Sequence, residues 1–172
     1  MIIYNHIMNS FEEVKCNNGC CYYRHAPYEY EHVPYIVSML KLKKSGSFIF
    51  DKQHKKVLLV QSRGQMWGPP KGSIQQNETP LECAVREVKE ETGIDITESQ
   101  FSGSTVIKSK ALYYFIDTVD EWSVYPQRDI KDNDANGIGW FHIDCLEKWK
   151  EEGLIMNQHC RILIKRIFDK DI

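Results

Sequence analysis

The segment Gly72–Ile94 (GSIQQNETPLECAVREVKEETGI) constrains the fold most, because it predicts one helix with both ends marked. Thr79 suits the N-cap, Pro80 the first helical position, and Gly93 the end of the helix. Within Pro80–Thr92 the apolar positions recur at helical spacing, as Leu81, Ala84, Val85, Val88 and Thr92. This apolar stripe predicts that the helix packs on a sheet.

Three glutamates of the same helix fall on one arc of its surface. At ~100° per residue, Glu87 and Glu91 are about 40° apart, and Glu90 lies about 60° to the other side of Glu87. Like charges one turn apart destabilise a helix unless cations pair with them. The cluster is therefore either a solvated acidic face or a set of oxygen ligands suited to Mg²⁺ or Mn²⁺. Arg86 lies beside it, and its planar guanidinium can orient a carboxylate.

Short β-branched and aromatic runs predict strands at Ser45–Phe50, Lys56–Gln61, Gly103–Ser109, Leu112–Thr118 and Gly137–Ile143. The residues Asp51–His54 between the first two predict a hairpin. Two further helices are expected, at Leu146–Glu152 and Asn157–Phe168. Strands interleaved with a few helices predict an α/β fold with a mixed central sheet.

The spacing of the helical segment resembles the Nudix box at every specified position. Gly72 is followed after five residues by Glu78, and after seven more by Arg86–Ile94 (REVKEETGI). The resemblance implies an α/β/α sandwich in which the box forms loop, helix and loop. It divides the chain into an N-terminal extension of uncertain structure, 1–34, and a Nudix hydrolase domain, 35–172. It also implies an enzyme that hydrolyses a diphosphate linkage in a nucleoside diphosphate derivative.

The same resemblance assigns roles by position. It implies a set of ligands for Mg²⁺ or Mn²⁺, namely Glu87, Glu90, Glu91 and the backbone carbonyl of Lys71. It further implies that Glu78 and Arg86 form an ion pair that holds the loop and orients these glutamates, as residues around a metal site commonly do. The ions would neutralise the diphosphate and lower the pKa of the attacking water, and a general base is also needed.

Two segments beyond the helix bear on the substrate. Met66–Gly72 (MWGPPKG) resembles loops of both messenger-RNA decapping Nudix enzymes and animal-type diadenosine tetraphosphate hydrolases. Pro126–Leu146 (PQRDIKDNDANGIGWFHIDCL) resembles a decapping segment and aligns Asp134 with a catalytic glutamate of those enzymes. The sequence therefore favours cleavage of the 5′ cap of messenger RNA, with Asp134 as general base. Because aspartate is one methylene shorter, Asp134 could instead be a turn residue, with Asp132, Glu90 or Glu91 as the base.

The alternative substrate, a dinucleoside polyphosphate, needs aromatic side chains that sandwich a base. The candidates are Tyr113, Tyr114, Trp122 and Trp140, which could equally be core residues. Trp67 could pack in the core or flank the site. An RNA chain would need cationic contacts, for which the candidates are Lys41, Lys43, Lys44, Lys165, Arg166 and Lys170, although such residues are often a solvated face.

Composition narrows the remaining choices. Lys plus Arg is 22 and Asp plus Glu is 24, so the net charge of −2 gives no overall attraction to nucleic acid or membrane. No apolar run approaches the ~20 residues of a membrane-spanning helix, and the N-terminus does not resemble a secretory signal. A reducing, cytoplasmic compartment is therefore expected for the six cysteines, which are Cys16, Cys20, Cys21, Cys83, Cys145 and Cys160.

The N-terminal cysteines allow three interpretations. Cys16, Cys20, Cys21 and His25 could form a tetrahedral zinc site, with His32 as a spare ligand. They could instead be ordinary free or buried cysteines, or include a redox pair.

Two other functions remain open at this stage. One is a binding protein that keeps the fold without catalysis, which the complete set of box glutamates disfavours. The other is a pool-cleaning enzyme that acts on damaged nucleotides. The sequence does not indicate the oligomeric state.

Overall fold

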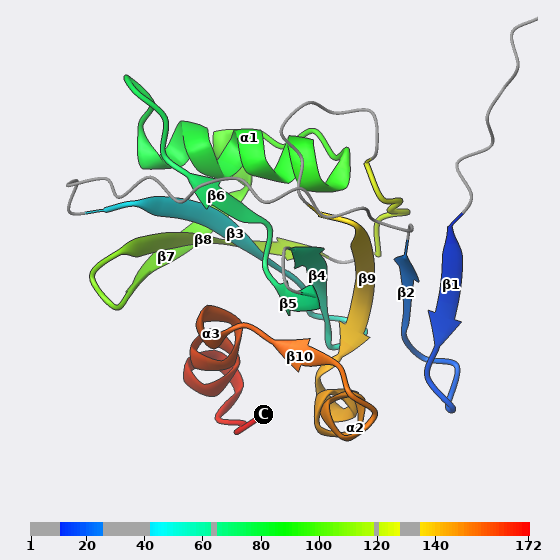
Figure 1. Ribbon diagram of the computed structural model, residues 1–172. Helices are drawn as coiled ribbons and strands as arrows, with labels where there is room; N and C mark the ends of the chain where they lie inside the picture. Colours follow the sequence, from blue (N-terminus) through cyan, green and yellow to red (C-terminus); the bar gives the residue numbers. More distant parts are fainter. Residues whose placement is uncertain (1–10, 26–41, 63–64, 119–120, 128–134) are drawn as a thin grey trace, which may run out of the picture.

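The computed structural model describes residues 11–25, 42–62, 65–118, 121–127 and 135–172. They form one mixed sheet with helices on both faces (Figure 1). The main path of the sheet runs in the order β1 (Glu12–Lys15), β2 (Tyr22–His25), β9 (Gly137–His142), β4 (Lys56–Ser62), β3 (Lys44–Asp51), β8 (Ala111–Thr118) and β7 (Phe101–Ile107). β3 and β8 are parallel, and the other neighbouring pairs are antiparallel. The predicted α/β fold with a mixed sheet is confirmed.

The helices separate into two layers (Figure 1). α1 (Pro80–Thr92) covers one face of the sheet, and α2 (Leu146–Glu151) and α3 (Gln158–Phe168) cover the other. The side chains of β4 alternate between these two layers. Leu58 packs in the core beside α1, whereas Leu59 packs in the core beside α2 and α3. Two opposed apolar faces explain why the central strands are continuous apolar runs.

The predicted elements are all present, with small differences at their ends. α1 has the predicted bounds, whereas α3 begins one residue later than expected, because Asn157 is its N-cap and accepts a hydrogen bond of 2.8 Å from the amide of Cys160. β9 ends at His142 because Ile143 begins a short 3₁₀ turn, Ile143–Cys145. β7 is displaced toward the N-terminus, since Ile107 begins the turn to β8.

Two short strands that the sequence pattern did not predict build the loop ahead of α1. β3 and β4 pair at their hairpin end, through Phe50–Val57 and Asp51–Lys56. Farther along, β6 (Lys71–Ser73) pairs with β3, and β5 (Met66–Gly68) pairs with β4 and with β10 (Ile155–Met156). The chain between Met66 and Ser73 is thus hydrogen-bonded to the diverging strands on both sides, which fixes it against α1.

The N-terminal residues that are described extend the sheet. β1 and β2 form an antiparallel hairpin, and β2 pairs with β9 from Tyr22–Trp140 to His25–Gly137. Their sequence has no clear period, and the neighbouring strand β9 supplies the register. Within the described part of the chain, no helix is long and apolar enough to cross a membrane.

Candidate active site

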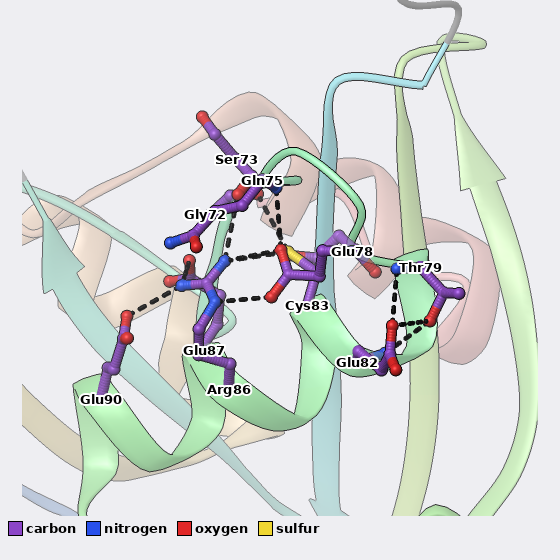
Figure 2. Close-up of polar contacts among 11 residues, drawn as sticks. Gly72, Ser73, Gln75, Glu78, Thr79, Glu82, Cys83, Arg86, Glu87 and Glu90 are labelled. Atoms are coloured by element: carbon purple, nitrogen blue, oxygen red, sulfur yellow. Dashed lines mark hydrogen bonds and ion pairs between the residues drawn. The ribbon is translucent and has the colours of Figure 1, made fainter.

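α1 is held at both ends by the residues that the sequence predicted. The Thr79 hydroxyl accepts a hydrogen bond of 3.2 Å from the amide of Glu82, and the Glu82 carboxylate accepts one of 2.8 Å from the amide of Thr79 (Figure 2). At the other end Gly93 has φ of 76° and donates its amide proton to the carbonyl of Lys89. This reciprocal capping fixes where the helix starts, and therefore which direction each glutamate takes.

The buried side of α1 includes two of the three glutamates. Glu87 is 8% exposed and Glu91 is 3% exposed, whereas Leu81 and Val85 are only partly buried. The buried stripe is therefore rotated from the predicted apolar stripe toward the carboxylates. A solvated acidic face is the wrong interpretation for Glu87 and Glu91, because the loop of β5 and β6 packs over them.

Arg86 joins the loop to the helix (Figure 2). Its Nε and Nη2 atoms donate hydrogen bonds to the two carboxylate oxygens of Glu78, at 2.6 and 3.0 Å. Nη2 also donates to the carbonyl of Ser73 at 3.1 Å. Nη1 donates to Glu87 at 2.6 Å and to Glu90 at 2.9 Å. The ion pair between Glu78 and Arg86 that the sequence predicted is present, with the two-pronged geometry that suits a guanidinium.

The pKa values of this pair move in the directions expected for a partly buried ion pair. The hydrogen bond from Arg86 lowers the pKa of Glu78, and the amide of Gln75, 2.8 Å from the same carboxylate, lowers it further. Glu78 in turn raises the pKa of Arg86 above its usual value. Both groups therefore stay charged at neutral pH, and Arg86 is a permanent cation beside Glu87 and Glu90.

Two further contacts between loop and helix involve neighbouring residues of the loop. The amide of Lys71 donates a hydrogen bond of 2.8 Å to the Glu91 carboxylate. A Cβ atom on Gly72 would lie 1.9 Å from Oε1 of Glu87, so any larger residue at position 72 would occupy the space of that carboxylate. The sequence identified Gly72 as the first box position and the Lys71 carbonyl as an implied metal ligand. Their contacts with Glu91 and Glu87 required the tertiary structure.

The donor set suits a hard divalent cation. It offers three carboxylates and the Lys71 carbonyl, all of them oxygen ligands. Arg86 donates hydrogen bonds to Glu87 and Glu90, whereas the Lys71 amide donates one to Glu91. Arg86 would remain anchored through Glu78 and Ser73 if Nη1 released its two glutamates.

Several other predicted site residues lie elsewhere. Asp134, the predicted base, and its alternative Asp132 are outside the described residues, as are Lys41 and His32. Trp67 is a core residue, 2% exposed and with its ring centroid 5.1 Å from that of Phe141.

The aromatic residues considered for base stacking divide into two groups. Trp140 and Tyr113 are fully buried, and Tyr113 places its hydroxyl 2.9 Å from Nδ1 of His159. Tyr114 and Trp122 are partly exposed. Tyr114 packs on Phe101, with ring centroids 5.0 Å apart. Trp140 and Tyr113 are therefore core residues and cannot sandwich a base.

The cationic residues considered for RNA contacts also divide. Lys165 forms ion pairs with Asp169 and Asp171, at 3.3 and 2.8 Å, and Lys170 pairs with Asp144. Arg166 donates to the hydroxyl of Thr105 and the carbonyl of Val106. Each of the three C-terminal cations thus has a partner within the protein.

A second group of cations surrounds His159. Burial lowers the pKa of this histidine to about 4, and the charges of Lys71, Lys44 and Lys108 lower it further. These lysines come from β6, from β3 and from the turn between β7 and β8. Among them the sequence pointed only to Lys44 as a cation for RNA, because the three are brought together only by the pairing of β3 with β6 and β8.

Comparisons with known proteins find relatives of this chain. The sequence profile described as the NUDIX domain matches residues 42–157. A protein of Invertebrate iridescent virus 3, whose name calls it hydrolase 111R, is 31% identical over 149 residues, which are 81% of this chain and 85% of the viral protein. The m7GpppN-mRNA hydrolases of Saccharomyces cerevisiae and Caenorhabditis elegans are 32% and 33% identical over 117 residues, 63% of this chain. Those residues are only 12% and 14% of the two relatives.

Solved structures show the same fold in enzymes with different names. The E. coli dihydroneopterin triphosphate pyrophosphohydrolase has a TM-score of 0.53 at 18% identity, over 73% of this chain and 96% of that one. The C. elegans Ap4A hydrolase has a TM-score of 0.51 at 19% identity, over 72% of this chain and 94% of that one. At such identities the likeness establishes the fold and not the substrate.

Proposed function

The chain belongs to the Nudix family of diphosphate hydrolases, and we propose that its substrate is the 5′ cap of messenger RNA. Cleavage of the cap diphosphate would release a methylated guanosine diphosphate from the RNA. The observation that carries this proposal is the similarity over 117 residues to two m7GpppN-mRNA hydrolases. The resemblance of Met66–Gly72 and Pro126–Leu146 to decapping segments supports it from separate parts of the chain.

We propose that Glu87, Glu90, Glu91 and the Lys71 carbonyl hold the divalent cation that Nudix hydrolases generally use. When bound, Mg²⁺ or Mn²⁺ would neutralise the diphosphate oxygens and lower the pKa of a water molecule, so that it can lose a proton and attack phosphorus as hydroxide. The protein's own contribution is positioning. The Lys71 amide holds Glu91, and Gly72 leaves room for Glu87. Arg86, which is held by Glu78, orients the side chains of Glu87 and Glu90.

Asp134 is the proposed general base. It would take the proton of the attacking water as the leaving phosphate separates. Replacing Asp134 with Asn removes the basic oxygen while keeping the size of the side chain. The rate on capped RNA should then fall roughly 10²-fold or more, as expected for the loss of general-base help, while RNA affinity stays close to that of the wild type.

The RNA chain needs cationic contacts beyond the cap. The lysines around His159, which are Lys44, Lys71 and Lys108, are the best placed of the described residues, because Lys71 supplies the proposed carbonyl ligand and Lys44 lies in the strand that pairs with its loop. Contacts of this kind bind phosphates without reading the bases, and their strength falls as salt rises. A cytoplasmic location goes with this proposal, because capped messenger RNA is translated and degraded there.

A substrate panel with Mg²⁺ or Mn²⁺ tests the proposal. It compares capped RNA, free cap dinucleotide, diadenosine tetraphosphate, diphosphoinositol phosphates and nucleoside triphosphates. Capped RNA should have the highest kcat/KM, with a dependence on salt that the cap dinucleotide lacks. Fast cleavage of diadenosine tetraphosphate with slow cleavage of capped RNA would replace decapping by dinucleoside polyphosphate hydrolysis. A preference for a nucleoside triphosphate would indicate a pool-cleaning enzyme.

A further inference from the structure

Four cysteine side chains meet where the β1–β2 hairpin lies against the start of α2. Cys16, Cys20 and Cys21 belong to the turn of the hairpin, and Cys145 directly precedes α2. Each of the four sulfur atoms lies within 4.8 Å of the other three. Sγ of Cys20 is 3.5 Å from Sγ of Cys16 and 3.6 Å from Sγ of Cys145.

We propose that these four cysteines bind one structural zinc ion. In a tetrahedral zinc site with Zn–S bonds of ~2.3 Å, the sulfur atoms are about 3.8 Å apart. The two separations of 3.5 and 3.6 Å are close to this value, and every other pair is within 4.8 Å. Four protein ligands complete a tetrahedron and leave no position for a substrate, so the site is structural rather than catalytic.

The hairpin turn explains how adjacent cysteines can share one ion. Neighbouring residues of a strand point to opposite faces, which would separate Cys20 from Cys21. Here the turn is closed by hydrogen bonds from the Gly19 amide to the Cys16 carbonyl, 2.8 Å, and from the Cys16 amide to the Cys21 carbonyl, 3.0 Å. Gly19 has φ of 66°, and Cys20 lies in the bend outside both strands. The strand alternation therefore does not apply to Cys20.

The ligand set differs from the one considered from sequence. His25 is at the far end of β2, where Nε2 lies 3.3 Å from Nδ2 of Asn136. Cys145 takes the fourth position instead, from 125 residues beyond Cys20 in the chain. A sequence pattern of nearby cysteines and histidines could not find it, because the contact depends on the pairing of β2 with β9.

The surroundings of the cluster suit bound thiolates. Nε1 of Trp149 donates a hydrogen bond to Sγ of Cys21 at 3.2 Å, so this sulfur already acts as an acceptor. Such donors commonly stabilise the ligands of a metal site. Cys21 is buried, and the other three are partly buried, so the ion would be shielded but reachable. Binding would release the thiol protons to solvent and join the hairpin to α2, which stabilises the edge of the sheet.

Metal analysis of the full-length protein, purified under reducing conditions without added chelator, is the first test. We expect about one zinc per chain. Exchange with Co²⁺ should give the sulfur-to-cobalt charge-transfer absorption and the intense visible bands of a tetrahedral thiolate site. Oxygen ligands such as the box glutamates cannot produce the charge-transfer band. This readout therefore succeeds or fails independently of the proposed hydrolase activity.

Substitution identifies the ligands. Cys145→Ser and Cys20→Ser should lower the zinc affinity by roughly 10-fold or more. His25→Ala and Cys83→Ala are the matched controls, and both should keep one zinc and the cobalt spectrum. If the serine variants do not fold, the wild-type zinc content and cobalt spectrum decide alone. Wild-type protein with less than about a tenth of a zinc per chain, iron in its place, or no charge-transfer band would overturn the proposal, as would loss of zinc in His25→Ala.

Discussion

Gly72 and Glu87 occupy adjoining space, since a Cβ atom on the glycine would lie 1.9 Å from Oε1 of the glutamate. Glu87 cannot easily move aside. It is 8% exposed, and Nη1 of Arg86 donates to the same oxygen at 2.6 Å. The glycine of the loop thus sets the position of a carboxylate on the helix.

Gly72→Ala should therefore displace Glu87 and lower the rate. A misplacement of ~1 Å can cost about 10²-fold, and we expect a loss of kcat of about 10- to 100-fold. Steady-state kinetics of the purified variant measure this. Gly103→Ala is the matched control, because its nearest atom would be 3.6 Å away, an ordinary contact. Wild-type kinetics in Gly72→Ala would show that the position of Glu87 does not matter for catalysis.

The ion pair between Glu78 and Arg86 should be measurable as a coupling energy. The side chains are 12% and 22% exposed, so the pair is only partly screened by water. A double-mutant cycle with Glu78→Gln and Arg86→Ala should give about 1 to 3 kcal/mol, measured by denaturant unfolding. Arg86→Lys keeps the positive charge but cannot form the bidentate contact, so this variant should retain only part of the coupling energy. A coupling of zero would mean that the contact contributes nothing to stability.

Substitutions of the box glutamates should affect activity much more than stability. Glu90→Gln and Glu91→Gln each remove one negative charge from a crowded helix, but Glu90→Gln also loses its ion pair with Arg86, so the melting temperature without added metal should change little. Activity with Mg²⁺ or Mn²⁺ should be lost, because a ligand for a hard cation is missing. Thermal denaturation and a metal-dependent rate assay measure the two effects. A double variant that hydrolyses its substrate near the wild-type rate would refute the assignment of these ligands.

The turn between β3 and β4 should make a pH-dependent contribution. Asp51 is buried, and its carboxylate accepts hydrogen bonds from the amides of Gln53 and His54 at 2.9 and 3.1 Å, and lies 2.6 Å from Nδ1 of His54. Burial alone would raise the pKa of Asp51, but the bonds to His54 and Gln53 outweigh it, and the pKa is lowered. The charged carboxylate therefore stabilises the fold above the unfolded-state pKa of about 3.9. That contribution is lost as the pH falls through the lower folded-state pKa.

Asp51→Asn should consequently lower the free energy of unfolding at pH 7 by about 1 to 2 kcal/mol. The difference from the wild type should shrink as the pH falls below about 3.9. Denaturant unfolding of both proteins from pH 7 to pH 3 checks this. A difference that stays constant over that range would show that the charge of Asp51 is not its source.

Local signals determined where α1 lies. Thr79, Pro80 and Gly93 act within one turn of the helix, through their own backbone angles and hydrogen bonds, so their effect is readable without the rest of the chain. The strands were predicted for a similar reason. Each central strand buries side chains on both faces, and that requirement leaves a run of apolar residues in the sequence.

The position of the loop was decided by tertiary structure. β5 and β6 are three residues each, and MWG and KGS carry no strand period. They become strands because β4 and β3 diverge beyond Val57 and Phe50 and offer them unpaired edges. The amide of Lys71 and the space beside Gly72 then meet Glu91 and Glu87.

The sequence by itself therefore determined the helix, the main strands and the identity of the acidic residues, because each depends on neighbours within a few positions. Only the tertiary structure decided that Glu87 and Glu91 are buried, that Trp67 is a core residue, and that Cys145 lies beside Cys20. The physical reason is that such contacts join residues tens to more than a hundred positions apart. They form only when strand pairing brings those segments together, and no local propensity encodes which strands will be neighbours.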